Sequence, residues 1–238
     1  MSDIGISNSV AVALTLVLVA IVVATFAGAF LIGSIPFGYI IGRIFYGTDI
    51  RGRGSGNIGA MNALRTLGVA GAIAVLLLDA LKGFAPTLWA QDFFRGHLDM
   101  SGEGFPPTDQ LMGSLAATGA VLGHCFSPWL RFRGGKGVAT SFGAVFALCW
   151  PAGIAAVAGW IVGAASTRYS SVGSLLGSVL APIAIYGFTR SLPETAYGII
   201  AALIIFVRHR DNIARLCAGT ESPIGKGSRS RGPYSQHP

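Results

Sequence analysis

The stretch AVALTLVLVAIVVATFAGAFLIGSIPFGYIIGRIFY spans residues 11–46 and contains a single charged side chain, Arg43. A helix needs about 20 apolar residues to cross a hydrocarbon core of about 30 Å, so this stretch is longer than one simple span requires. Gly33, Ser34 and Pro36 predict a kink in the helix before the chain emerges near Arg43. We therefore expect a bent first membrane helix.

The rest of the chain has the same apolar character. Hydrophobic residues make up 52% of the sequence, charged residues only 11%, and there are 34 glycines. This is a membrane composition, because a bilayer solvates apolar surface and small residues allow helices to pack closely. Pro151 and Gly153 predict a turn near Trp150 that splits one long run into two short spans. We expect an all-α polytopic membrane protein with seven transmembrane helices, built from apolar runs at about 11–46, 67–91, 110–130, 138–167, 171–188 and 195–207.

The positions of Lys and Arg predict the orientation, because these residues gather in cytoplasmic loops. Seven spans place the termini on opposite sides. If the N-terminus is outside, only Arg95 and Arg190 face outward and Lys82 lies within a helix. The other basic residues of the 17 then face the cytoplasm: Arg43, Arg51, Arg53, Arg65, Arg131, Arg133, Lys136, Arg168, Arg208, Arg210, Arg215, Lys226, Arg229 and Arg231. We expect an external N-terminus and a cytoplasmic C-terminus; an unsplit 138–167 span would turn Arg168 and the basic tail outward.

Composition also argues against several classes of function. The net charge of +7 is scattered between apolar stretches without a nucleic-acid motif, so we expect no nucleic-acid partner. Cys125, Cys149 and Cys217 lie far apart and have no metal-ligand spacing. We expect no metal site, no disulfide framework and no cofactor.

The first predicted cytoplasmic loop reads GSGNIGAMN at 54–62 and is followed by Arg65. Glycines allow successive backbone N–H groups to point at one anion, and an arginine adds a bidentate charged donor. A flexible membrane loop of the same composition is the alternative. The loop predicts a phosphate site that uses Gly54, Ser55, Gly56, Asn57, Gly59, Asn62 and Arg65.

The second predicted cytoplasmic loop, FRGGKGVAT at 132–140, places a glycine-rich turn directly before a helix. A helix N-terminus offers free N–H groups and a positive dipole end, so this turn predicts an anion site. Leu130 and Gly137 stand where a nucleotide P-loop would need glycine and Ser or Thr, so ATP hydrolysis is not expected. A positive-inside turn is the alternative to a phosphate site formed by Gly134, Gly135, Lys136 and Gly137.

Two further segments reach the same side. Ser170 and Ser171 follow a short link and could donate to an anion or only cap the next helix. His209 and Asn212 lie three residues apart on one helix face, where they could orient and polarise a hydroxyl. A basic helix bound to anionic headgroups is the alternative for that stretch.

Asp79 and Lys82 form an i, i+3 pair inside an apolar run. Charged residues inside a membrane are costly and often functional, but mutual pairing gives these two a structural explanation. We do not assign them to the chemistry.

At these motifs the chain resembles the bacterial membrane family of acyl-phosphate:glycerol-3-phosphate acyltransferases. The matching pieces extend from about 31 to 221 in the order of the family. They are GSIPFG at 33–38, GSGNIG at 54–59, LDALKG at 78–83, Gly123 and His124, residues 132–140, YSS at 169–171, RHRDNIARL at 208–216, Gly219 and Glu221.

The resemblance implies a monomeric enzyme of the bacterial inner membrane with its active site facing the cytoplasm. It would transfer a fatty acyl group from an acyl-phosphate to the 1-hydroxyl of glycerol 3-phosphate, which gives lysophosphatidic acid and phosphate at the start of phospholipid synthesis. Its partners would be these two substrates and membrane lipids. The implied catalytic residues are Ser55, Arg65, Lys136, His209 and Asn212, with Ser171 as a further serine and Glu221 as an architectural residue.

We expect one transmembrane acyltransferase domain over residues 1–222. The polar basic tail over 223–238 extends beyond the family pattern, and its Ser, Arg, Gly and Pro content predicts disorder. Met61 departs from the family pattern, where a threonine is usual. A transporter for a phosphorylated anion is the competing class, but no internal repeat is visible. An acyl-CoA-dependent enzyme is chemically close, but the His-x4-Asp motif is absent, and a purely structural membrane protein would leave the four loops unexplained.

Overall fold

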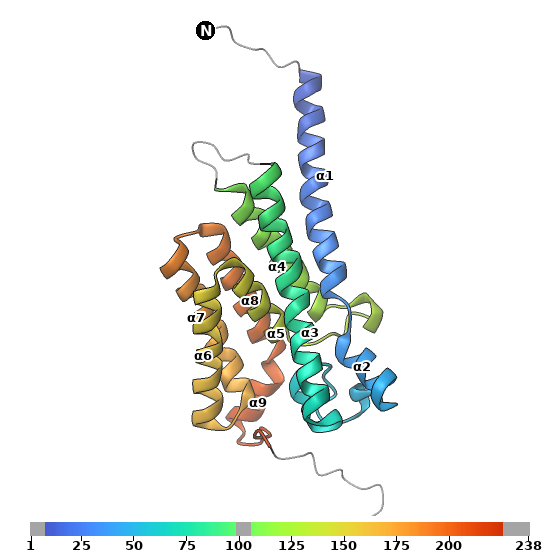
Figure 1. Cartoon of the computed structure of the whole chain (residues 1–238). Helices are drawn as coiled ribbons and strands as arrows, with labels where there is room; N and C mark the ends of the chain where they lie inside the picture. The colour runs from blue at the N-terminus through green and yellow to red at the C-terminus, as the bar shows by residue number, and fades with distance from the viewer. Residues whose placement is uncertain (1–7, 99–105, 226–238) are drawn as a thin grey trace, which may run out of the picture.

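The computed structural model describes residues 8–98 and 106–225, and their regular structure is entirely helical. The predicted disordered tail lies almost entirely outside the described residues. Figure 1 shows a helical bundle in which α1 extends past the other helices, with α2 and α9 at the opposite end. The helices are α1 Asn8–Gly33, α2 Phe37–Tyr46, η1 Ile50–Gly52, α3 Ala60–His97, α4 Thr108–Cys125, η2 Pro128–Leu130, α5 Val138–Leu148, α6 Trp150–Thr167, α7 Ser170–Thr189, α8 Leu192–Arg208 and α9 Arg210–Cys217.

Both predicted breaks are confirmed. The first apolar run ends α1 at Gly33 and starts α2 at Phe37, with Pro36 as the N-cap. The 138–167 run is interrupted at Cys149, and Pro151 lies in the first turn of α6, where its missing N–H removes no helical hydrogen bond. These breaks allow one hydrophobic stretch to supply two helices of different direction.

The start of α3 differs from the expectation. The apolar pattern begins at 67, yet the helix starts at Ala60 and continues through a break at Gly68, where φ is 81°. Glycine reaches this left-handed region without the Cβ clash that other residues suffer. Asn62 and Arg65 therefore lie on the first turns of a helix and not in an open loop.

Four helical segments are long and apolar enough to cross a membrane: Asn8–Tyr46, Ala60–His97, Trp150–Thr167 and Ser170–Thr189. A fifth span arises if α8 and α9, which meet at 58°, count as one. The 11 residues of α5 extend only about 16 Å at 1.5 Å per residue, which is shorter than a bilayer core. The predicted count of seven spans and the predicted orientation therefore stay predictions.

Glycines allow the helices to approach closely. A Cβ on Gly123 of α4 would lie 2.1 Å from the Phe30 carbonyl oxygen of α1, and a Cβ on Gly83 of α3 would lie 2.0 Å from the Thr140 oxygen of α5.

Within this interior the predicted ion pair is confirmed, because Lys82 Nζ lies 2.7 Å from Asp79 Oδ1 and both side chains are 2% exposed. Lys82 Nζ also donates to the Ile35 carbonyl oxygen at 2.7 Å. The pair thus fastens α3 to the bend between α1 and α2.

Candidate active site

The carboxylate of Glu221, which follows α9, is the centre of a hydrogen-bonding cluster. Ser171 Oγ at the start of α7 donates to Glu221 Oε1 at 3.0 Å, and Asn212 Nδ2 of α9 donates to the same oxygen at 2.6 Å. Arg215 Nε donates to the other oxygen at 2.7 Å. Burial opposes ionisation of Glu221, but these three donors outweigh it and lower its pKa. The group is therefore a fixed anion that orients its donors.

Lys136 joins this cluster from the glycine-rich turn. Its Nζ donates to Asn212 Oδ1, and the side chain is half-buried. Burial lowers the pKa of the ammonium to about 8; Glu221 opposes the fall, whereas Arg215 and Arg65 add to it. A poorly solvated cation among other cations is well suited to receive an anionic group.

The start of α3 contacts the chain next to Glu221. The guanidinium of Arg65 donates to the Ser222 carbonyl oxygen at 3.4 Å, immediately after Glu221. The N–H of Ile224 donates to the Arg168 carbonyl oxygen at 2.8 Å, which connects this tail to the link before α7. Residues after α9 therefore hold the start of α3 and the α6–α7 link together.

His209 lies at the junction of α8 and α9 and is 3% exposed. Its Nδ1 lies 2.8 Å from the Ile205 carbonyl oxygen. Because a carbonyl only accepts, this bond requires a proton on Nδ1. Burial, together with the charge of Lys136, lowers the pKa of His209 to about 4, so at neutral pH Nε2 carries a lone pair. A neutral histidine in this state can accept a proton from a hydroxyl.

The glycine-rich turn is fixed from two sides. The N–H groups of Gly134 and Gly135 donate to the carbonyl oxygens of Cys125 and His124 at 3.1 and 3.0 Å. Arg208 of α8 donates to the carbonyl oxygens of the same two glycines at 2.8 and 3.0 Å. Gly137 has a φ of 86° and caps α5. The N–H groups of Gly134 and Gly135 were predicted to hold phosphate, but they bind the end of α4 and fix the turn there. The turn directs the side chain of Lys136 towards Asn212.

The α2–α3 loop is organised by Asn62, which is 1% exposed. Its Oδ1 accepts from Ser55 N–H at 2.8 Å, and its Nδ2 donates to the carbonyl oxygens of Ile50, Arg53 and Asn57 at 2.8, 3.2 and 2.7 Å. Asn57 Oδ1 accepts from Gly59 N–H at 2.8 Å. The two asparagines predicted as phosphate ligands therefore shape the loop, which leaves the side chain of Ser55 exposed.

The sequence also matches a known family. The model of the family described as "Glycerol-3-phosphate acyltransferase" matches residues 22–219. The chain belongs to this family.

Relatives and solved structures agree with this family assignment. A glycerol-3-phosphate acyltransferase of Gluconobacter oxydans (strain 621H) is 42% identical over 206 residues, 85% of this chain and 93% of the relative. One from Nitrobacter winogradskyi is 46% identical and covers 84% of this chain and 94% of the relative. The crystal structure of PlsY (YgiH), an integral membrane glycerol 3-phosphate acyltransferase in its glycerol 3-phosphate form, is 32% identical with a TM-score of 0.76, over 86% of this chain and 96% of the other. The lysophosphatidic acid form gives 30% and 0.73, over 85% and 94% of the two chains.

In this member of the acyltransferase family, three of the four predicted segments meet directly. Lys136, Asn212 and Ser171 share one hydrogen-bonding cluster, and Arg65 contacts its edge. Ser170 opens α7 without a capping bond, so the capping alternative does not describe the serines. Ser55, Gly54 and Gly56 are exposed on the neighbouring loop, and no hydrogen bond joins Ser55 to the Glu221 cluster within the described residues.

Two arginines were missed as site residues. Arg208 holds the glycine-rich turn, and Arg215 holds Glu221. Both were predicted as cytoplasmic charges within a matching motif and given no contacts, because the partners of Arg208 are more than 70 residues away and the partner of Arg215 lies beyond α9. The signal that could have found Arg215 is its position six residues before a lone glutamate. Among the described residues no group of three or more His, Cys, Asp or Glu side chains could hold a metal.

Proposed function

We propose that this protein transfers a fatty acyl group from an acyl-phosphate to the 1-hydroxyl of glycerol 3-phosphate, giving lysophosphatidic acid and inorganic phosphate. The observation that carries the proposal is the meeting of Lys136, Asn212 and Glu221 beside a buried neutral His209. A cation for phosphate and an acceptor for a hydroxyl proton are the groups that this reaction needs. The relatives are glycerol-3-phosphate acyltransferases, and the two PlsY structures are glycerol 3-phosphate and lysophosphatidic acid forms, which supports this acceptor and this product.

The chemistry requires little covalent help from the protein. An acyl-phosphate is a mixed anhydride with a good leaving group, so the acceptor oxygen can form its bond to the acyl carbon as the bond to the phosphate oxygen breaks. Lys136 and Arg65 would stabilise the departing phosphate, and the neighbouring turn glycines would hold Lys136 in position. Ser55 and Asn212 would orient the acceptor, and His209 Nε2 or the phosphate itself would take the hydroxyl proton.

The proposal includes the membrane arrangement. We propose seven spans (α1, α3, α4, α5, α6, α7 and α8), an external N-terminus, and an active site at the cytoplasmic face of a bacterial inner membrane, with the enzyme acting as a monomer. The distribution of basic residues supports this orientation, since Arg65, Lys136, Arg168 and Arg208 lie on the segments around Glu221. A reporter fused to the C-terminus and active only in the cytoplasm would test it; an external C-terminus would contradict it.

The donor is tested directly by giving purified protein labelled glycerol 3-phosphate with either palmitoyl-phosphate or palmitoyl-CoA. We expect labelled lysophosphatidic acid from the acyl-phosphate alone. Product from palmitoyl-CoA alone would replace the proposed donor with a thioester. If neither donor gives product while labelled glycerol 3-phosphate crosses vesicle membranes that contain the protein, the enzyme assignment is wrong and the protein is a transporter.

A further inference from the structure

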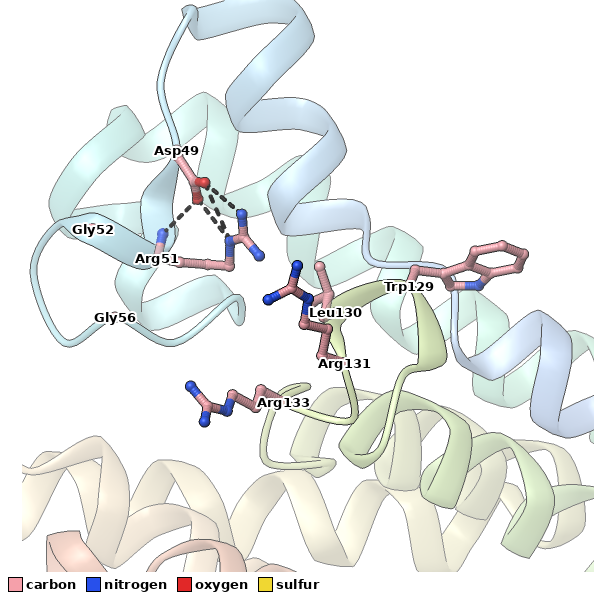
Figure 2. Close-up of a pocket in the computed structure, with 8 residues that line it drawn as sticks. All are labelled: Asp49, Arg51, Gly52, Gly56, Trp129, Leu130, Arg131 and Arg133. Atoms are coloured by element: carbon pink, nitrogen blue, oxygen red, sulfur yellow. Dashed lines mark hydrogen bonds and ion pairs between the residues drawn. The ribbon is translucent and has the colours of Figure 1, made fainter.

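A pocket of about 790 Å³ lies between the α2–α3 loop and the turn that carries Arg131 and Arg133, and its walls are strongly basic. Figure 2 shows Asp49 and Arg51 on the α2–α3 loop facing Arg131 and Arg133 on the turn after η2, whereas the indole of Trp129 in η2 points away from that loop. The lining does not include Lys136, Asn212 or Glu221. The pocket is therefore a second basic feature, and its three arginines are residues that the proposed reaction does not use.

Two of its three arginines are available for a ligand. Asp49, the only acidic residue of the lining, is already occupied, because its Oδ2 lies 2.6 Å from Arg51 and 3.4 Å from Arg43. Arg51 is held further by the ring of Tyr39, 4.4 Å below its guanidinium. Within the part of the chain that the structure describes, the guanidinium groups of Arg131 and Arg133 have no hydrogen-bond or ion-pair partner. A dianionic group such as a phosphate matches this surplus of charge.

The backbone that carries these arginines is held in an unfavourable conformation. Arg131 and Phe132 have φ values of 53° and 61°, the left-handed region that non-glycine residues rarely adopt. The N–H of Phe132 donates to the Ser127 carbonyl oxygen at 2.8 Å, and that of Arg131 donates to the Pro128 oxygen at 3.1 Å. Such strain persists where the surroundings enforce it, and it concentrates at functional sites. Here it places two arginines opposite a third.

An apolar groove of about 280 Å³ continues from the pocket. It is lined by Ile35, Pro36, Tyr39 and Ile40 at the start of α2, and it shares Trp129 and Leu130 with the arginine pocket. Trp129 Nε1 donates to Ser34 Oγ at 2.8 Å, so the indole between the two spaces is fixed. A basic pocket joined to an apolar groove fits a ligand that has an anionic head and an alkyl chain.

We propose that this pocket and groove bind a phosphate-bearing lipid, with its phosphate on Arg131 and Arg133 and a chain along Ile35, Pro36 and Ile40. Two kinds of lipid have an anionic phosphate and an alkyl chain. One is a single-chain lipid phosphate of the kind the proposed reaction consumes or makes, and the other is a two-chain anionic phospholipid of the bilayer. The binding proposal does not depend on acyl transfer, since it rests on charge and shape alone.

The test measures lipid binding to the purified full chain in a neutral detergent by native mass spectrometry. The probes are lysophosphatidic acid, phosphatidylglycerol, phosphatidylcholine and inorganic phosphate. We expect Arg131→Gln/Arg133→Gln to weaken binding of the anionic lipids at least about tenfold. The matched control, Arg190→Gln/Arg210→Gln, removes two exposed arginines elsewhere and is expected to bind as the wild type does.

The probes distinguish these two kinds of lipid. Binding of lysophosphatidic acid but not phosphatidylglycerol identifies a single-chain ligand, and binding of both identifies bilayer lipid. Equal affinity for inorganic phosphate and for lipid would overturn the role of the groove. Unchanged lipid binding in the arginine double variant would overturn the whole proposal.

A second variant distinguishes a loss of lipid binding from misfolding. Arg131→Lys/Arg133→Lys keeps both charges but loses the bidentate geometry, and we expect intermediate binding at an unchanged thermal midpoint. The assay needs no turnover, so failure of the proposed function would appear separately, as intact lipid binding without lysophosphatidic acid formation.

Discussion

Lys136 and Asn212 are 76 residues apart, and the ammonium of the first donates a hydrogen bond to the side-chain oxygen of the second. Asn212 bridges Lys136 and Glu221, because its amide nitrogen donates to Glu221 at 2.6 Å. A cation and an anion are thus linked through a neutral amide that keeps them apart. This arrangement leaves Lys136 with charge that Glu221 does not fully neutralise, and it makes the Lys136 pKa sensitive to its neighbours.

The first prediction concerns the pH dependence of acyl transfer. Lys136 is a cation below its folded pKa of about 8 and loses its charge as pH rises through that value. We expect kcat/KM to fall above about pH 8 in the wild type. Arginine stays charged throughout this range, so Lys136→Arg is expected to keep reduced activity without the alkaline fall. An alkaline fall at the same pH in Lys136→Arg would assign it to another group.

The second prediction is that Glu221→Gln shifts the alkaline fall of kcat/KM to a different pH. The negative charge of Glu221 raises the pKa of Lys136, so its removal lowers that pKa and shifts the fall to lower pH. The loss of charge-assisted bonds from Arg215 and Asn212 is expected to reduce kcat/KM at neutral pH by about tenfold or more. Asp109→Asn is the control, since it removes an arginine-paired carboxylate at the start of α4. A fall that stays at the same pH in Glu221→Gln would contradict the coupling.

The glycine-rich turn can be tested by adding one methyl group. A Cβ on Gly135 would lie 2.0 Å from Nε2 of the buried His124, so Gly135→Ala must displace the turn. Overpacking of this kind costs about 1–3 kcal/mol, and the displacement of Lys136 should lower activity at least about tenfold. Gly28→Ala on α1 meets nothing within 4 Å and serves as the control. Equal activity of the two variants would show that the turn does not need this close packing.

The buried Asp79–Lys82 pair predicts a non-additive effect on stability. Asp79→Leu leaves a buried ammonium without its partner and should cost about 3–5 kcal/mol. Asp79→Leu/Lys82→Met removes both charges and should recover most of that loss, apart from about 1 kcal/mol for the bond to Ile35. Thermal unfolding in detergent measures both variants. A double variant less stable than the Asp79→Leu single variant would show that the pair contributes net stability of its own.

Much of the fold was accessible from the sequence because the membrane imposes simple rules. Apolar length located the helices, and Pro36 and Pro151 marked both breaks, which the structure confirms. The start of α3 was misplaced because Asn62, Arg65 and Thr66 interrupt the apolar pattern, and polar residues do not prevent a helix from starting at Ala60. The sequence around Gly68 also did not indicate that α3 would continue past the non-helical backbone at this residue.

The sequence indicated residues that lie close together in the structure, but not the contacts between them. Lys136, Ser171 and Arg65 were chosen as residues that can contact phosphate and Asn212 as one that can orient a hydroxyl, and the structure brings them around Glu221. Asn62 looked like a ligand because side-chain amides bind anions, yet an amide can equally satisfy backbone groups, and here it does. Which use prevails depends on the loop conformation, and spacing alone does not determine that conformation.

The most direct test of the central claim is the initial rate of lysophosphatidic acid formation from palmitoyl-phosphate and labelled glycerol 3-phosphate by purified wild type, Lys136→Ala and Arg210→Gln at pH 7. Loss of the Lys136 cation should remove about 3 kcal/mol or more of transition-state stabilisation, a fall in rate of at least about a hundredfold. Arg210, whose side chain is 80% exposed, should be replaceable without effect. A Lys136→Ala enzyme as active as Arg210→Gln would contradict the account.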